Sequence, residues 1–60
     1  MKKETNYRIE IEYKNGGLTS MFCNNYSCAV AYCEKLENEY KQIKTAIYDN
    51  KKTIRFYNSL

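Results

Sequence analysis

Apolar residues recur every three to four positions in one stretch of the chain, from Tyr26 to Tyr40. This spacing places side chains on one face of a helix. The stripe consists of Tyr26, Ala29, Val30, Cys33, Leu36 and Tyr40. Asn25 precedes it and is of the residue type that accepts hydrogen bonds from first-turn amides, so we assign Asn25 as the N-cap. The pattern predicts a helix over residues 25–41, although no glycine marks its C-terminal end.

Before this helix, apolar and polar residues alternate from Tyr7 to Lys14, which predicts a strand. Asn15-Gly16 suits the two central positions of a type I′ turn, so residues 7–23 are predicted to form a hairpin. A two-residue loop pairs Ile9 with Phe22 and directs both toward the same face. A bulge at Gly17 is the alternative, and it shifts the second strand by one residue.

The alternation returns after the helix and predicts a second hairpin over residues 43–57. With Asn50-Lys51 as its loop, Ile47 pairs with Ile54 on one face and Ala46 pairs with Arg55 on the other. The same register places Phe56 on the face of Ile47.

Two hairpins separated by a helix predict an α+β fold of order ββαββ, with a four-stranded, mainly antiparallel sheet and one helix packed on one face. The chain is predicted to be a single domain over residues 1–60, with a flexible N-terminus over 1–6. The order of the strands stays open. The predicted helix-side core comprises Tyr7, Ile9, Ile11, Tyr13, Leu18, Phe22, Ala29, Val30, Cys33, Leu36, Tyr40, Ile43, Ile47, Ile54 and Phe56.

The chain has 60 residues and a net charge of +3, with 43% hydrophobic and 28% charged residues, which is a globular composition. Burial in so short a chain barely offsets the entropy of ordering it, so we expect a homodimer. The charged N-terminus lacks the apolar region of a secretory signal, and no apolar run approaches the roughly 18 residues of a membrane span. These features and an odd cysteine count predict a cytoplasmic location and no membrane partner.

Catalytic and cofactor signatures are missing from the sequence. There is no histidine to act as a general base or zinc ligand, and no glycine-rich phosphate loop. Cys23, Cys28 and Cys33 supply only three of the four ligands of a structural zinc site, no histidine completes the set, and the two on the helix diverge around its axis. We therefore predict no catalytic residue, no metal and no cofactor. A redox or intermolecular disulfide role for the cysteines is the alternative.

The sheet face away from the helix is the predicted contact surface. Tyrosine, arginine and methionine are enriched at protein interfaces, and this face is predicted to carry them. The predicted partner-binding residues are Arg8, Met21, Lys44, Tyr48, Arg55 and Tyr57. Two alternatives remain: tyrosine is also a good strand former at half-exposed sites, and tyrosines with lysines bind single-stranded nucleic acid. Glu10 and Glu12, predicted on the same face, oppose phosphate binding.

The sequence thus predicts a non-enzymatic protein-interaction module that acts through a sheet face or edge. Its small size and its Lys-, Asn-, Tyr- and Ile-rich composition, which suits an AT-rich genome, favour an inhibitor or modulator of a host protein encoded by a phage or mobile element. The second hypothesis is a small single-stranded RNA- or DNA-binding protein that stacks bases on Tyr48 and Tyr57.

Overall fold

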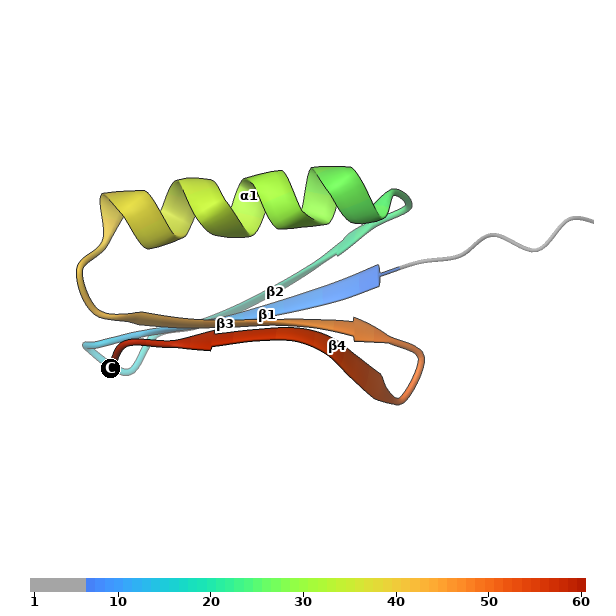
Figure 1. The fold of residues 1–60 in the computed structure, drawn as a ribbon. Coiled ribbons are helices and arrows are strands. Elements are labelled where there is room, and N and C mark those ends of the chain that lie inside the picture. Colours follow the sequence, from blue (N-terminus) through green and yellow to red (C-terminus); the bar gives the residue numbers. More distant parts are fainter. Residues whose placement is uncertain (1–6) are drawn as a thin grey trace, which may run out of the picture.

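Four strands and one helix follow the predicted order ββαββ in the computed structural model, which describes residues 7–60. The predicted flexible N-terminus, residues 1–6, lies outside the described residues. The elements are β1 (Tyr7–Tyr13), β2 (Leu18–Cys23), α1 (Tyr26–Glu39), β3 (Ile43–Asp49) and β4 (Lys52–Asn58). The strands form one antiparallel sheet of order β2-β1-β3-β4, with α1 lying along one face (Figure 1). The predicted α+β fold is confirmed.

The first hairpin turns through a bulge rather than through a two-residue loop. Tyr13 and Gly17 bracket the turn, with Tyr13 N donating to Gly17 O and Gly16 N donating to Tyr13 O, both at 2.9 Å. Gly16 has φ +93°, a conformation that glycine adopts without steric cost. The extra residue shifts β2 by one, so that Ile9 pairs with Met21 and not with Phe22. The two-residue pairing was wrong, and the one-residue shift that the sequence left open is what occurs.

The second hairpin has the predicted two-residue loop, since Asp49 pairs with Lys52 and Asn50 adopts φ +61°. The register then shifts between Ile47 and Tyr48, which leaves Ile54 without a direct partner on β3. As a result Ile47 pairs with Arg55 rather than with Ile54, and the rest of β4 is displaced by one position. Because successive strand residues point to opposite faces, this bulge exchanges the faces of Arg55 and all later β4 residues.

The helix begins where the cap predicts. Asn25 Oδ1 accepts from the amides of Ser27 at 2.8 Å and Cys28 at 3.3 Å. Such a cap satisfies amides that have no partner within the helix. Helical residues end at Glu39, and the amide of Tyr40 still donates to Leu36 O. The helix therefore ends two residues before the predicted position 41.

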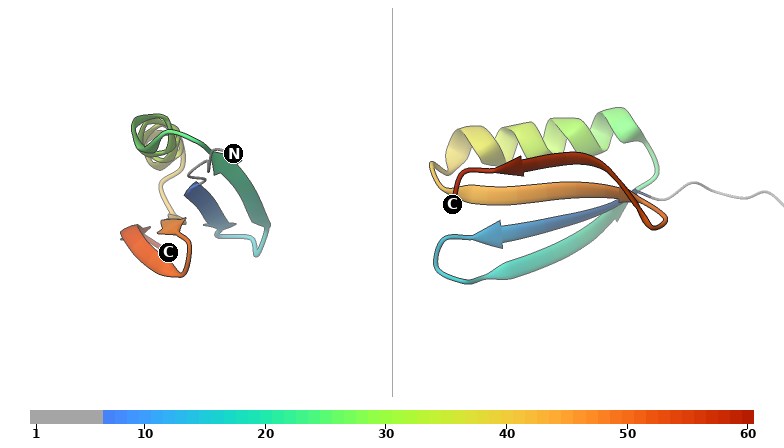
Figure 2. Two further views of the ribbon diagram at one scale, coloured as in Figure 1. Left: turned by 90° about the vertical axis from the view of Figure 1, so that its right-hand side faces the viewer. Right: turned by 60° about the horizontal axis from the view of Figure 1, so that its bottom comes forward.

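The core lies between α1 and the inner strands, and Figure 2 shows these two layers end-on and from below. Its fully or nearly buried members are Ile9, Ile11, Ala29, Cys33, Leu36, Ile43 and Ile47. Aromatic pairs flank it, with ring centroids 5.7 Å apart for Tyr7–Tyr26 and 5.1 Å apart for Tyr13–Tyr40. The core is therefore formed by β1, β3 and the buried stripe of α1.

Four residues predicted to be in the core lie outside it. Leu18, Phe22 and Phe56 are all exposed, because the extra residue in the turn before β2 and the bulge in β4 direct them to the opposite face of the sheet. Tyr40 is exposed for a different reason: it follows the last helical residue and rests against Tyr13 at the edge of the core.

Candidate protein-binding face

Among residues 7–60, no element covers the sheet face opposite α1, and we call it the open face (Figure 1). Its residues follow from the strand registers and from the alternation of side chains along each strand. They are Leu18, Ser20 and Phe22 on β2; Arg8, Glu10 and Glu12 on β1; Lys44, Ala46 and Tyr48 on β3; and Thr53, Phe56 and Asn58 on β4.

Large apolar side chains stand on both flanks of the open face. Leu18 is 77% exposed and Phe22 66% exposed on β2, and Phe56 is 60% exposed on β4. Single exposed apolar residues are common on proteins, whereas several on one face mark an interaction surface. The open face thus combines the most exposed leucine and both phenylalanines of the chain.

The charged residues of the open face lie between these flanks and are paired with one another. Lys44 Nζ lies 3.1 Å from Glu12 Oε1, and Arg8 Nε lies 3.4 Å from Glu10 Oε2. The Arg8 guanidinium also covers the Tyr48 ring, with Cζ 4.7 Å from the ring centroid. Two cations and two carboxylates give the open face a net charge of zero.

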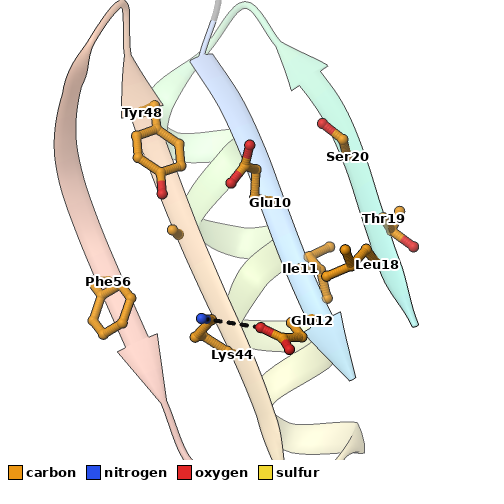
Figure 3. Close-up of a pocket in the computed structure, with 10 residues that line it drawn as sticks. Glu10, Ile11, Glu12, Leu18, Thr19, Ser20, Lys44, Tyr48 and Phe56 are labelled. Carbon is orange, nitrogen blue, oxygen red and sulfur yellow. Dashed lines mark ion pairs between the residues drawn. The ribbon is translucent and has the colours of Figure 1, made fainter. Parts of the chain in front are cut away.

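A hollow of about 350 Å³ occupies the middle of the open face (Figure 3). Leu18 and Ser20 border it on the β2 side, and Phe56 and Tyr48 border it on the other side. Ala46 also lines it, as do both members of the Lys44–Glu12 ion pair. The small side chains at Ser20 and Ala46 leave this space between larger neighbours, so the hollow suits an apolar side chain of a partner.

Of the six predicted contact residues, the structure places Arg8, Lys44 and Tyr48 on the open face. The placement of Met21, Arg55 and Tyr57 was wrong. The β2 shift directs Met21 into the helix-side core, and the β4 bulge places Arg55 and Tyr57 on the helix side. The open face instead carries Leu18, Phe22 and Phe56, three residues of the predicted core. For Leu18 and Phe22 on β2, the only indication in the sequence was the alternative register of the first hairpin, which shifts the second strand by one residue.

Arg55 joins a polar cluster on the helix side. Its Nη1 and Nη2 donate to the two carboxylate oxygens of Glu37 at 2.7 and 3.1 Å, and Thr45 Oγ1 donates to Glu37 Oε2 at 2.6 Å. The Arg55 hydrogen bonds hold the pKa of Glu37 below its usual value and raise the pKa of Arg55. This cluster connects α1 to β4, while the helix itself packs over β1, β2 and β3.

The cysteines show no chemical grouping. Burial raises the pKa of the Cys33 thiol, which favours its neutral and unreactive form. Cys23 is half-buried and Cys28 is exposed, and all three thiols are free. Within residues 7–60, no three His, Cys, Asp or Glu side chains are grouped to hold a metal ion. The helix in this part of the chain is also too short and too polar to cross a membrane.

We expect acid to weaken the fold through Glu37. Its folded pKa is depressed, so the stabilisation is complete above the unfolded glutamate pKa of about 4.3 and is lost as pH falls through the folded value. Urea denaturation followed by circular dichroism from neutral pH to pH 3 should show this decline. Glu37→Gln should flatten the decline, because it removes the titrating group. Parallel curves for the two proteins would contradict this role.

The chain matches no protein-family model, no curated protein sequence and no solved structure. Its function must therefore be argued from the chemistry of the open face.

Proposed function

We propose that this protein is a non-enzymatic protein-interaction module whose binding surface is the open face. The observation that carries the proposal is the exposure of Leu18, Phe22 and Phe56 on one uncovered sheet face. Burying such side chains against a partner stabilises a complex by roughly 1.5–3 kcal/mol each when burial is complete. A small domain that leaves them in water gains this energy only by association.

The face is favoured over the sheet edges as the binding surface. Edge strand β4 carries the bulge at Ile54, and edge strand β2 has only 6 residues, which makes it a short template for an added strand. Bulges interrupt the row of unpaired backbone groups that an added strand needs. Edge pairing is therefore less well supported than contact through the side chains of the open face.

Nucleic-acid binding, the second hypothesis, has less support. Phosphate binding requires cationic side chains that are free to displace the counterions of the nucleic acid, whereas Arg8 and Lys44 are paired with carboxylates. Tyr57, one of the two proposed stacking platforms, is on the helix side, and Tyr48 is covered by Arg8. An open face of zero net charge fits a protein surface better than a phosphate backbone.

Photo-cross-linking tests the proposal in cells that express the chain. A photoreactive phenylalanine analogue at Phe22 should give covalent protein products that withstand nuclease treatment. The same analogue at Lys35, exposed on α1, is the matched control and should give few products. Products lost on nuclease treatment would instead favour nucleic acid. Equal yields from both positions would contradict a binding role of the open face.

Three further parts of the proposal go beyond the open face. The absence of catalysis, a cytoplasmic location and a role as a phage- or mobile-element-encoded inhibitor of a host protein were predicted from composition and length. They stay predictions.

A further inference from the structure

The open face can be read as a grid of three rows, since paired residues lie side by side across the four strands. In the order β2, β1, β3, β4, the first row is Phe22, Arg8, Tyr48 and Thr53. The second row is Ser20, Glu10, Ala46 and Phe56. The third row is Leu18, Glu12, Lys44 and Asn58. This grid shows which side chains meet when two such faces are brought together.

Two open faces can be stacked so that a two-fold axis runs between the two sheets, parallel to the strands and midway between β1 and β3. In this arrangement the grid is complementary to itself. It places β1 of one copy over β3 of the other and keeps each residue in its row. Glu12 then faces Lys44 of the second copy, and Arg8 faces Tyr48 of the second copy. Glu10 faces the small, uncharged Ala46 of the second copy. Every charge therefore meets an opposite charge, an aromatic ring or a small apolar group, and no like charges are opposed.

The other in-plane axis, perpendicular to the strands, exchanges the first and third rows and leaves each strand over its own copy. It places Arg8 over Glu12 and Phe22 over Leu18 of the second copy, but it also opposes two like charges. Glu10 then lies over Glu10 of the second copy, and two carboxylates repel each other at an interface that excludes water. This contact between like charges at Glu10 disfavours the axis perpendicular to the strands, and the axis parallel to them has no such contact.

The ring of Phe56 fits the same arrangement, whereas Leu18 and Phe22 face Asn58 and Thr53 of the second copy. Phe56 of one copy lies over Ser20 of the other, the small residue that borders the hollow of about 350 Å³. Its ring can enter this hollow, and the symmetry repeats the contact on the opposite flank. Face-to-face sheets pack about 10 Å apart with interdigitated side chains, which leaves room for one ring between them.

The size of the open face indicates a weak complex. Four strands spaced about 4.8 Å apart and about 20 Å long give a flat footprint of roughly 400 Å² per copy. The two copies together then cover roughly 800 Å², an area that projecting side chains increase, compared with the roughly 1,200–2,000 Å² buried in total by stable complexes. We therefore expect association in the micromolar range.

From these observations we propose that the partner of the open face is the open face of a second copy, related by a two-fold axis parallel to β1 and β3. This inference rests on the proposed function and specifies its partner. The resulting dimer is a sandwich of two sheets with a helix on each outer side.

Charge exchange between copies tests this arrangement. Glu12→Lys and Lys44→Glu each create a like-charge contact, and each should weaken dimerisation at least about tenfold. An equimolar mixture of the two variants restores Lys–Glu contacts between copies, so heterodimers should form with nearly wild-type affinity. The ion pair within each chain stays broken in this mixture, so recovery reports contact between copies. Sedimentation velocity, and native mass spectrometry with one variant labelled with ¹⁵N, measure the outcome.

Glu10→Lys mixed with Lys44→Glu is the matched control. It introduces the same charges, but residue 10 faces Ala46 of the second copy and not residue 44. This mixture should not recover. Recovery in both mixtures would show that overall charge attraction and not the proposed alignment drives association, and recovery in neither would also overturn the alignment. Circular dichroism confirms that each variant is folded.

Failure of this inference can be distinguished from failure of the proposed function. A wild-type chain that stays monomeric to high micromolar concentration overturns the second-copy inference. The photo-cross-links from Phe22 then decide separately whether the open face binds another protein. If they also fail, the proposed function falls with the inference.

Discussion

Replacing Glu37 with alanine is expected to lower the free energy of unfolding by about 2–3 kcal/mol. Removing one partner of a fully buried ion pair costs roughly 3–5 kcal/mol, and the Arg55 side chain retains 20% exposure, through which water can compensate part of this loss. Thr45, which is fully buried, also loses the acceptor of its hydroxyl. Domains of this length have roughly 3–9 kcal/mol of stability in total, so a large share is at risk.

Urea denaturation of the purified variants measures this effect. Glu39→Ala is the matched control, since Glu39 is exposed on the same helix and should change stability by less than about 0.5 kcal/mol. If Glu37→Ala unfolds at the same urea concentration as Glu39→Ala, the cluster does not stabilise the fold.

The Glu37–Arg55 pair also affects which residues β4 presents on the open face. Adjacent strand residues point to opposite faces, so holding Arg55 toward the helix directs Phe56 toward the open face. A contact on the helix side of the sheet thereby directs an aromatic group to the opposite side. We infer that the cost of partly burying this charged pair is tolerated because the pair specifies the register of β4.

The elements of the fold could be predicted because each has a clear period. On β1, Ile9 and Ile11 alternate with Glu10 and Glu12, so only one assignment of faces buries the apolar residues. The stripe on α1 and the cap at Asn25 define the helix in the same way. Where the odd-numbered residues of a strand are apolar and the even-numbered ones charged, the sequence determines which side chains face the core.

The edge strands lack this contrast. On β2, both parities hold apolar side chains: Leu18 and Phe22 alternate with Met21 and Cys23. On β4, Phe56 lies between Arg55 and Tyr57, and all three have long side chains with apolar parts. The hydrophobic pattern is compatible with either register there, and the bulges at Gly16 and Ile54 decide it. Because the open face depends on both edge strands, its residues were predicted less well than the fold.

Two alanine substitutions should separate the observed register from the predicted one. Ile47→Ala is expected to lower the free energy of unfolding by about 3 kcal/mol, within the 2–5 kcal/mol typical of buried isoleucine, because Ile47 is fully buried beneath α1. Phe56→Ala should cost less than about 1 kcal/mol in dilute solution, because its side chain is largely exposed there. Urea denaturation at low protein concentration measures both.

The concentration dependence of stability extends this comparison to the open face. A dimer stabilises the folded state more as protein concentration rises, so the wild-type chain should become harder to unfold in concentrated solution. Phe56→Ala should lose this dependence, since its ring is the group that enters the hollow of the second copy. Ile47→Ala should retain the concentration dependence, although its free energy of unfolding is lower at every concentration, because the open face is unchanged. If both substitutions lower the free energy of unfolding by about 3 kcal/mol in dilute solution, Phe56 belongs to the core and β4 has the register without a bulge. The open face would then lack the aromatic side chain that its self-association requires.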